Sequence, residues 1–476
     1  MKLTEILEKI TGYEKIAEYS NKTYVELWKS WYSGKVKDFH FYSYYNGVAH
    51  IPAERMSLGM AKKICEDWAN LLINEKTDIT LSDENTQKNI EKIFEDCDFW
   101  QKANDGIEKI FAFGGGAFVV SVEGLSIKDD GSIIPDGNIN ISFCNAEKVY
   151  PITVEDGKIT ECAFIRSDSN NTNIAVHLKD ETGNYVIHNL VATGKDLNSL
   201  TMVPESEYIF NTQSKTPWFV YLRPNIANNI DIDSPLGISV FANAIDTLKE
   251  IDIIYDSYAN EFLLGRKRIF VNAKQAVIDM KSGEQKATFD TRDGAFYVLP
   301  EADDGSVFIQ NDTQSLRVSD HKIGIQDQLN MLSQKCGMGT EHYKFDSGSV
   351  ATATQIISEN SDMFRTIKRH EVFVEKALKT IVNAVIYASN TFTSVPMKPD
   401  VTIEVKFDDS IIEDKVAERA QDRLDMSQNV MSKAEYRSKW YNEDLETAQK
   451  HIDEIGEFTI DDNDTDEYQV NGEENK

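Results

Sequence analysis

The sequence has few cysteines and a shortage of positive charge. Its 476 residues include five Cys, and 50 Lys and Arg stand against 79 Asp and Glu, so the formal net charge is −29. The cysteines are scattered without paired spacing, which argues against a disulfide framework or a zinc site and is typical of free thiols in a reducing cytoplasm. The acidic balance argues against wrapping nucleic acid by bulk electrostatics, because phosphate binding needs clustered Lys and Arg.

Long apolar runs are also missing. No stretch approaches the ~18 apolar residues of a membrane span, so we expect no membrane partner. The first residues predict an amphipathic helix with acidic side chains and lack the apolar block of a signal peptide. What is present is a hydrophobic fraction of 41%, which is enough for sizeable cores. The length predicts roughly two to four structural units.

Phosphate-binding and metal-binding motifs are absent as well. The glycine-rich stretch Phe113–Val120 is followed by neither a Lys–Ser nor a Lys–Thr pair, and a strand rather than a helix comes next. We interpret it as a backbone turn where a side chain would not fit. The pair Gly194–Lys195 also fails the motif, so ATP hydrolysis is not expected. His342 and His370 have no metal-ligand spacing, and we expect no metal or other cofactor.

The stretch from Pro235 to Arg268 repeats apolar residues at alternating spacings of three and four. This pattern predicts one amphipathic helix with a packing seam. Pro235 suits its first turn and Gly265 its end, which gives a length of roughly 44 Å. The seam comprises Phe241, Ala244, Leu248, Ile251, Tyr255, Tyr258 and Phe262.

The opposite face of this predicted helix is acidic. The pairs Asp246/Glu250 and Asp252/Asp256 could bind a divalent ion where subunits meet. A solvated surface is the commoner reason for such pairs.

Before this helix, the chain changes from helical to alternating patterns. We predict helices up to about residue 33, over Met56–Ile73 and over Thr86–Phe113, and an irregular segment over residues 35–54. From about 117 to 222 apolar and polar residues alternate between turn signals, which predicts an antiparallel β-rich unit.

After Gly265 the pattern changes several times. A compact α/β insertion is followed by a second helix from about Ser319 and by a polar loop. A long helix then spans Ala351–Asn390, followed by a strand at 401–407 and charged helices over 411–455. The acidic tail predicts disorder.

This order resembles that of the portal proteins of tailed double-stranded-DNA phages, in particular the siphophage type of Gram-positive hosts. The resemblance is carried by PLGISVFANAIDTLKEIDIIYDSYANEF, the following GRKRIFV, the junction FDSGSVATATQIISENS and the turn FAFGGGAFVV. It covers most of the chain and ends at about residue 456.

The resemblance implies an α+β fold with phage portal architecture: a mixed α/β wing, a helical stem, a small α/β clip and a helical crown. The implied parts are the wing (1–234), stem helix 1 (235–265), the clip (266–318), stem helix 2 (319–338), a tunnel loop (339–350), a long wing helix and strand (351–410), the crown (411–456) and a disordered acidic tail (457–476).

The function implied is a channel for DNA at one capsid vertex. A ring of about twelve subunits would let double-stranded DNA pass during packaging and ejection. The implied partners are the terminase large subunit, scaffold and major capsid proteins, and head-completion or tail-adaptor proteins. The protein would assemble in the host cytoplasm, reside in the virion and catalyse no reaction.

The resemblance also implies roles for particular residues. The seam would pack between subunits, and the tunnel loop would line the narrowest part of the channel; its candidates are Tyr343, Lys344, Phe345, Asp346, Ser347, Gly348 and Ser349. Lys344 would touch passing phosphates weakly, unless it is only a solvated loop lysine. Arg266, Lys267 and Arg268 would meet DNA or the terminase, or would merely favour a helix C-terminus.

Two other functions stay open at the level of sequence. One is a different structural component of the head or connector. The other is a nuclease of the packaging apparatus, which would need Asp, Glu or His gathered around a metal ion. The acidic residues are predicted to lie mostly on helix surfaces and in the tail, which favours the portal.

Overall fold

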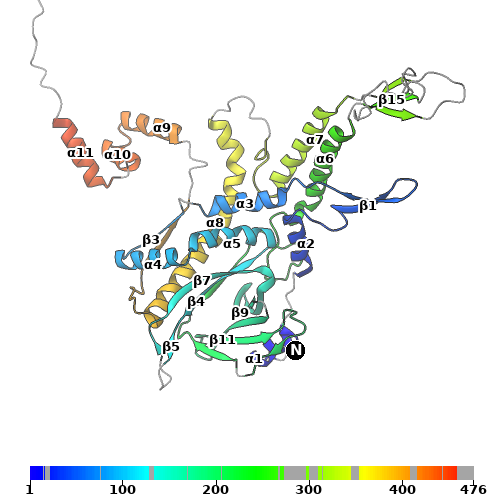
Figure 1. The fold of residues 1–476 in the computed structure, drawn as a ribbon. Coiled ribbons are helices and arrows are strands. Elements are labelled where there is room, and N and C mark those ends of the chain that lie inside the picture. The colour runs from blue at the N-terminus through cyan, green and yellow to red at the C-terminus, as the bar shows by residue number, and fades with distance from the viewer. Residues whose placement is uncertain are drawn as a thin grey trace, which may run out of the picture. The chain divides into compact units, whose positions relative to one another are not determined.

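The computed structural model describes residues 1–13, 16, 22–74, 77–127, 133–168, 170–204, 206–265, 268–272, 296–299, 309–312, 315–344, 353–407, 415–441 and 443–457. These residues form two compact units, each described here by itself. The larger unit comprises Met1–Ser349 and Glu359–Asp408, and the smaller comprises Val350–Ser358 and Asp409–Lys476. Helices and sheets occur together (Figure 1), which confirms the α+β class.

Helices supply much of the larger unit. They are α1 (Leu3–Thr11), α2 (Lys22–Tyr32), α3 (Met60–Leu72), α4 (Glu84–Asp96), α5 (Phe99–Phe113), α6 (Ile245–Leu264), α7 (Val318–Lys335) and α8 (Ala353–Phe392), whose first turns group with the smaller unit. Short 3-10 turns lie at Ala146–Lys148 and Ala242–Ala244. Local sequence sets some of the ends. Asp83, for example, accepts a hydrogen bond from the Thr86 backbone N–H (2.9 Å) and caps α4.

The predicted β-rich unit forms two antiparallel sheets. One has the order β12–β11–β10–β9–β8, with β13 also paired to β11, and the other has the order β14–β4–β7. The strands are β4 (Gly116–Glu123), β7 (Asn138–Asn145), β8 (Val149–Glu155), β9 (Lys158–Ser167), β10 (Asn171–Lys179), β11 (Tyr185–Thr193), β12 (Thr201–Met202), β13 (Tyr208–Asn211) and β14 (Phe219–Leu222). Helix α1 packs Leu3, Ile6 and Leu7 onto apolar residues of the larger sheet.

Smaller sheets join other parts of the chain. They contain β1 (Phe41–Tyr45) with β2 (His50–Glu54), β3 (Asp78–Leu81) with β18 (Ile403–Lys406), β5 (Ser126–Ile127) with β6 (Ile133–Ile134), and β15 (Arg268–Asn272) with β16 (Phe296–Leu299) and β17 (Ile309–Asp312). The last sheet is mixed, since β15 pairs in parallel with β16 and antiparallel with β17. The described part of the insertion is thus strand, and any helix predicted for it lies outside the described residues.

The main core lies where the helices meet the smaller of the two large sheets. Its largest fully buried side chains include Trp28 of α2, Trp68 of α3, Trp218 beside β14 and Phe392 of α8. Burial of each such side chain stabilises the fold by roughly 1.5–3 kcal/mol. The Trp68 indole N–H donates to the carbonyl of Cys336 (3.2 Å), so this buried donor has a partner. The core therefore joins the N-terminal helices to the end of α7 and to α8.

The glycine-rich stretch is confirmed as a turn without room for side chains. Gly114 has a φ of 78°, and a Cβ atom added to it would lie 2.7 Å from the Gly237 carbonyl oxygen. A Cβ atom added to Gly237 would lie only 2.3 Å from the Gly114 carbonyl oxygen. The two backbone segments can approach this closely only because glycine has no Cβ atom, and any larger residue at either position would push them apart.

Helix α6 begins later than the sequence predicts. It starts at Ile245 rather than near Pro235 and is therefore about 30 Å long instead of roughly 44 Å. Residues 235–241 are buried but not helical, and Ala242–Ala244 form only a short 3-10 turn, because the backbone is bonded elsewhere: Val240 N–H donates to the Phe111 carbonyl (2.9 Å) at the end of α5. The predicted end is confirmed, since Gly265 follows the last helical residue.

The prediction that residues 35–54 are irregular is wrong in part, because this segment includes the β1–β2 hairpin. Asn46 Oδ1 accepts hydrogen bonds from the backbone N–H groups of Val48 (2.9 Å) and Ala49 (2.8 Å), and Gly47 has a φ of 95°. Asn-Gly between an aromatic run (Phe39–Tyr45) and a second run that contains Val48 and Ile51 is a hairpin signal, so the sequence contained the information.

The long helix and the charged C-terminal helices are confirmed. Helix α8 spans Ala353–Phe392, within two residues of the predicted bounds. The smaller unit contains α9 (Lys415–Ser427), α10 (Lys433–Tyr441) and α11 (Leu445–Glu457). Asp422 of α9 accepts hydrogen bonds from Lys439 Nζ (2.7 Å) and from the Trp440 indole N–H (2.8 Å), so polar pairs connect α9 to α10. The acidic tail lies outside the described residues.

Candidate functional site on helices α6 and α7

Helices α6 and α7 form an antiparallel pair that is fastened at both ends (Figure 1). Lys335 Nζ donates to Thr247 Oγ1 (2.9 Å) near the start of α6. Near its end, Arg317 Nη2 and Nε donate to the two carboxylate oxygens of Glu261 (2.8 and 3.2 Å). These hydrogen bonds lower the pKa of Glu261 to about 2. These contacts at both ends hold α6 and α7 together, so the position of the α6 side chains is well defined.

The predicted seam divides into two parts. Phe241, Ala244, Leu248 and Ile251 are 0–3% exposed and belong to the subunit's own main core. Their interpretation as contacts between subunits is therefore corrected, because no surface of these side chains is left for a neighbour. They belong to one cluster with buried residues of α3, α5, α7 and α8, so this chain buries them without a second copy.

The other three seam residues lie farther along α6 and stay open. Tyr255 and Tyr258 are half-buried, and Phe262 is 46% exposed. The Phe262 and Tyr258 rings meet edge to face, with centroids 5.1 Å apart. An exposed phenylalanine packed on a half-buried tyrosine is typical of a surface that a partner covers. The assignment of these three residues to an oligomer contact stays a prediction.

Asp252 is not part of a solvated acidic face. It is 3% exposed, and its carboxylate accepts hydrogen bonds from the Leu58 backbone N–H (2.8 Å), the Ser57 hydroxyl (3.0 Å) and the His40 ring (3.0 Å). One helical turn on, Asp256 accepts from the backbone N–H of Met56 (3.1 Å). These two carboxylates bind protein donors on both sides of the β1–β2 hairpin.

The first acidic pair, Asp246/Glu250, is exposed. Asp246 pairs with Lys249 (2.8 Å), whose hydrogen bond lowers the pKa of the Asp246 carboxyl. Among the described residues, no group of three or more His, Cys, Asp or Glu side chains is placed to hold a metal ion.

The loop after α7 is described as far as Lys344. The Tyr343 hydroxyl donates to Asp67 Oδ2 of α3 (2.8 Å), and its carbonyl accepts from the Gln326 amide (2.8 Å). Partial burial opposes ionisation of Asp67, but hydrogen bonds from His342, Lys63 and Tyr343 outweigh it and lower its pKa. The start of the predicted tunnel loop is thus attached to the subunit's own helices, and the Tyr343 hydroxyl is already occupied.

Lys344 forms an ion pair with Glu341, three residues earlier. The remaining loop candidates, Phe345, Asp346, Ser347, Gly348 and Ser349, lie outside the described residues. So do Arg266 and Lys267 of the basic cluster, while Arg268 is the first residue of β15 and lies opposite Asp312 of β17. The structure thus describes neither cluster completely, and both remain predictions.

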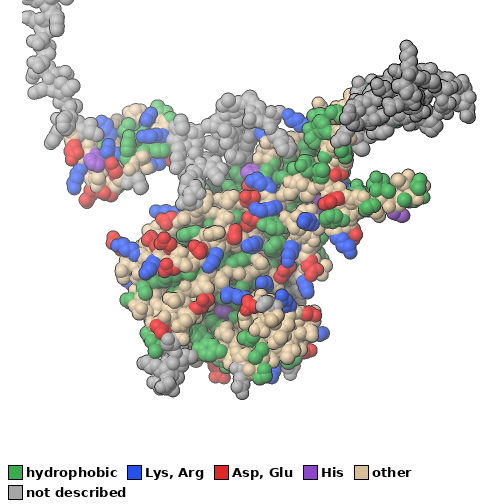
Figure 2. Space-filling model, in the orientation of Figure 1, with side chains coloured by type: hydrophobic (Ala, Val, Ile, Leu, Met, Phe, Trp, Pro, Cys, Tyr) green, Lys and Arg blue, Asp and Glu red, His purple; other side chains and the backbone are tan. Residues whose placement is uncertain are grey.

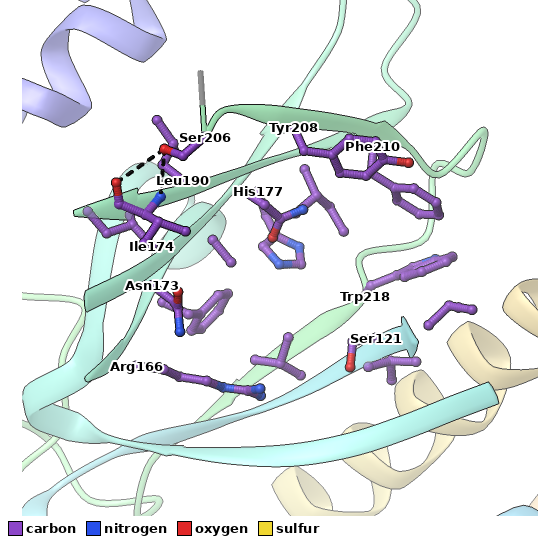
Figure 3. Close-up of a pocket in the computed structure, with 18 of the residues that line it drawn as sticks. Ser121, Arg166, Asn173, Ile174, His177, Leu190, Ser206, Tyr208, Phe210 and Trp218 are labelled. Carbon is purple, nitrogen blue, oxygen red and sulfur yellow. Dashed lines mark hydrogen bonds between the residues drawn. The ribbon is translucent and has the colours of Figure 1, made fainter. Parts of the chain in front are cut away.

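A cavity of about 500 Å³ lies between the two large sheets (Figure 3). Its walls include His177, Trp218 and, at the exposed side, Arg166. Burial lowers the pKa of His177 to about 3, which keeps the ring neutral. The described lining residues include no Asp, Glu or Cys, so no carboxylate–histidine or thiol–histidine pair for acid–base or nucleophilic catalysis is assembled there.

Comparison with known families decides what this architecture belongs to. The family model described as "Phage portal protein, SPP1 Gp6-like" matches residues 14–457. The chain belongs to this portal protein family. The resemblance seen in the sequence is thereby confirmed, and the protein is a phage portal protein, a head–tail connector component of the virion. Membership implies an oligomeric ring associated with other head and tail components.

Two further comparisons add little. A solved structure described as "Neck of native GTA particle computed with C12 symmetry" aligns with a TM-score of 0.43 and 10% identity, over 91% of this chain and 97% of that chain. No curated protein matches the sequence. Among the described residues, no helix combines the length and the apolar composition that crossing a bilayer requires.

Proposed function

We propose that this portal protein assembles in the host cytoplasm into a closed ring of about twelve copies at one capsid vertex. Double-stranded DNA passes through the ring during packaging and ejection. The family match over residues 14–457 carries this proposal. A closed ring needs heterologous contacts, in which one surface of each copy meets a different surface of the next. The open aromatic residues of α6, Tyr255, Tyr258 and Phe262, offer one such surface.

The electrostatics of the chain suit a conduit that does not grip DNA. With a net charge of −29 per copy, a ring repels the duplex over most of its surface. Asp246 and Glu250 of α6 are exposed and would add to a repelling wall. Lys344, already paired with Glu341, would give each copy only a weak, salt-screened phosphate contact. The duplex would be centred and stay mobile.

The partners we propose follow from the place of a portal in the particle. The insertion at residues 266–318, which begins with Arg266, Lys267 and Arg268, would face the terminase large subunit, which supplies the energy of packaging. Scaffold and major capsid proteins would surround the ring during assembly. Head-completion or tail-adaptor proteins would bind after packaging. The portal itself would catalyse no reaction.

Electron microscopy and in vitro packaging test this function together. Purified protein should form rings with a central hole, and the rings should support the formation of nuclease-protected DNA. Lys344→Ala should leave rings intact while altering DNA packaging or retention, and Lys344→Glu should have the larger effect because it adds like charge. Lys215→Glu, an exposed lysine between β13 and β14, is the matched control.

One outcome would contradict the portal function, and another would contradict the role of the loop. Monodisperse monomers that cleave DNA in the presence of a divalent metal would favour the nuclease. Rings that package and retain DNA normally with both Lys344 variants would keep the portal function but remove the loop from its mechanism.

A further inference from the structure

The β1–β2 hairpin, called the arm below (residues 39–55), extends away from the helices that carry it (Figure 1). Among the described residues its two strands form a sheet of their own, with one further bridge from Phe41 to Lys37 at the base, so the hairpin has no third strand and no core of its own. A two-stranded sheet of this kind is at best marginally stable in water unless something packs against it. The arm therefore needs a covering surface.

Both faces of the arm carry exposed aromatic side chains. Tyr44 lies opposite Ile51 on one face, and Tyr45 lies opposite His50 on the other. Tyr45 is 61% exposed, and Val48 at the turn is 87% exposed. Figure 2 shows hydrophobic side chains gathered along the arm. Exposed aromatic residues at this density are typical of residues that a protein partner buries.

The arm also carries no net charge in a strongly acidic chain, because its two charged side chains, Glu54 and Arg55, have opposite signs and stand at its base. From Phe39 to Ala53 there is no Asp, Glu, Lys or Arg, whereas each copy carries a net charge of −29. Two copies repel each other, so the surfaces through which they meet must be neutral or complementary in charge. The arm is neutral and would meet an acidic neighbour without a charge penalty.

The direction of the arm is fixed at its base. His40 Nδ1 accepts the Val36 N–H (2.9 Å), so the proton lies on Nε2, which donates to the buried Asp252 carboxylate. The same carboxylate binds Ser57 and Leu58, which follow β2. Both sides of the arm are thus fastened to α6 through a single side chain.

A second contact stiffens the arm itself. The Arg55 guanidinium donates to the Phe39 carbonyl (2.6 Å) and lies over the rings of Phe39 and Tyr42, 4.3 and 4.7 Å from their centroids. These cation–π contacts hold the two ends of the hairpin together. An arm that is held in one direction loses little conformational entropy when it docks.

We propose that the arm docks on the next copy of this chain in the ring, with Tyr44, Tyr45 and Val48 buried in that contact. The inference rests on the proposed ring. A second copy is the partner for two reasons. The arm carries no net charge, whereas each copy is strongly acidic. The arm is also attached to α6 at Asp252, and the aromatic residues Tyr255, Tyr258 and Phe262 follow on the same helix. Pro52 in β2 has no N–H to donate, so the contact uses the side-chain faces more than strand addition.

Photo-crosslinking tests the contact in intact rings. Tyr45 is replaced by p-benzoylphenylalanine, rings are isolated by size and irradiated, and products are separated under denaturing conditions. The expected result is a ladder of covalently joined copies. A control in which p-benzoylphenylalanine replaces Tyr208, an exposed tyrosine of β13, measures the background crosslinking. Rings that give only single chains from Tyr45 would overturn the arm contact and leave the portal function standing.

Substitution gives a second, independent measurement. The double variant Tyr45→Glu with Val48→Glu should melt at the parent's temperature yet form about tenfold fewer rings at equal concentration, since charge enters a neutral contact. Val372→Glu, on α8 and similarly exposed, should form rings like the parent. Normal rings from the double variant would contradict the proposal. A parent that forms no rings would instead refute the proposed ring function.

Discussion

The two parts of the seam on and before α6 share one sequence pattern and differ in what covers them. The four seam residues from Phe241 to Ile251 are enclosed by the subunit itself, whereas Phe262 is exposed and Tyr255 and Tyr258 are half-buried. The repeat of apolar residues thus shows which face of a helix is buried, but not whether the same chain or another copy buries it. The residue types agree in part with this division: three of the four core residues are aliphatic, with Phe241 the exception, whereas all three residues at the other end are aromatic.

The largest effect should come from a charge in the enclosed part. Leu248→Asp places a carboxylate in the main core and should cost several kcal/mol of folding free energy, because the charge has no partner there. The subunit should then be recovered unfolded or aggregated, instead of folded but unable to form rings. Thermal unfolding followed by circular dichroism measures this.

Ile253→Asp is the matched control on the same helix, because Ile253 is an exposed residue of α6. It should leave the melting temperature within a few degrees of the parent. A folded Leu248→Asp subunit that merely fails to form rings would show that this half is also an interface and would break the comparison.

The Asp252 contact should have the next largest effect. Asp252→Asn removes the charge that three donors share, and a buried hydrogen bond to a charged group contributes about 1.5–3 kcal/mol. We expect a loss of stability of this order in urea unfolding and faster hydrogen exchange in the arm. Asp246→Asn, at an exposed position, should change neither quantity measurably. Unchanged exchange in the arm of Asp252→Asn would show that the arm is held by other contacts.

Acid should weaken the main core through His370 of α8. Its ring is buried against Trp68 and Phe111, and burial lowers its pKa to about 3. In the unfolded chain this histidine titrates near ~6.5, so low pH favours unfolding. Stability should be full above about pH 6.5 and fall toward pH 3, by roughly 1.4 kcal/mol per pH unit at most.

Urea unfolding between pH 7.5 and 5 measures the slope of stability with pH. His370→Asn keeps an acceptor for the Asn225 backbone N–H, which His370 Nδ1 now binds (3.1 Å), and removes the titrating ring. The variant should therefore show a smaller slope than the parent. Equal slopes would mean that His370 is not the group through which acid acts on the core.

The smallest effect on the subunit should come from Phe262→Asp in the open part. Because Phe262 is 46% exposed, the free energy of unfolding should change by less than about 0.5 kcal/mol. Ring formation should nevertheless decrease, since the charge enters the predicted contact. Sedimentation of the folded variant measures this, and Leu263→Asp on the neighbouring exposed position shows whether the effect is specific to the seam. A variant that sediments as full rings would remove Phe262 from the interface.

The sequence predicted elements whose signal is local and long. The periodic pattern of α8, the charged C-terminal helices and the glycine turn at Gly114 were all recovered from neighbouring residues. Pairings between distant segments were not: β3 lies opposite β18, where Leu81 faces Ile403, and a four-residue strand gives little signal by itself.

The site was predicted less completely than the fold. The predicted start of α6 was wrong because the residues before Ile245 make a tertiary contact, the hydrogen bond from the Val240 N–H to the Phe111 carbonyl, that no local pattern shows. Asp252 was assigned to a polar face because its partners, such as His40 and Leu58, are nearly two hundred residues or more away in sequence. The β1–β2 hairpin, by contrast, was predictable from local sequence, because Asn46–Gly47 is a hairpin signal.

A cryo-electron microscopy map of the assembled ring tests the central claim most directly. We expect Tyr255, Tyr258 and Phe262 to lie against the next copy, with the arm docked on that copy and Phe241 to Ile251 enclosed by their own subunit. A ring in which the open part of α6 faces solvent, or in which Leu248 contacts a neighbouring copy, would contradict the division of the seam into a core half and an assembly half.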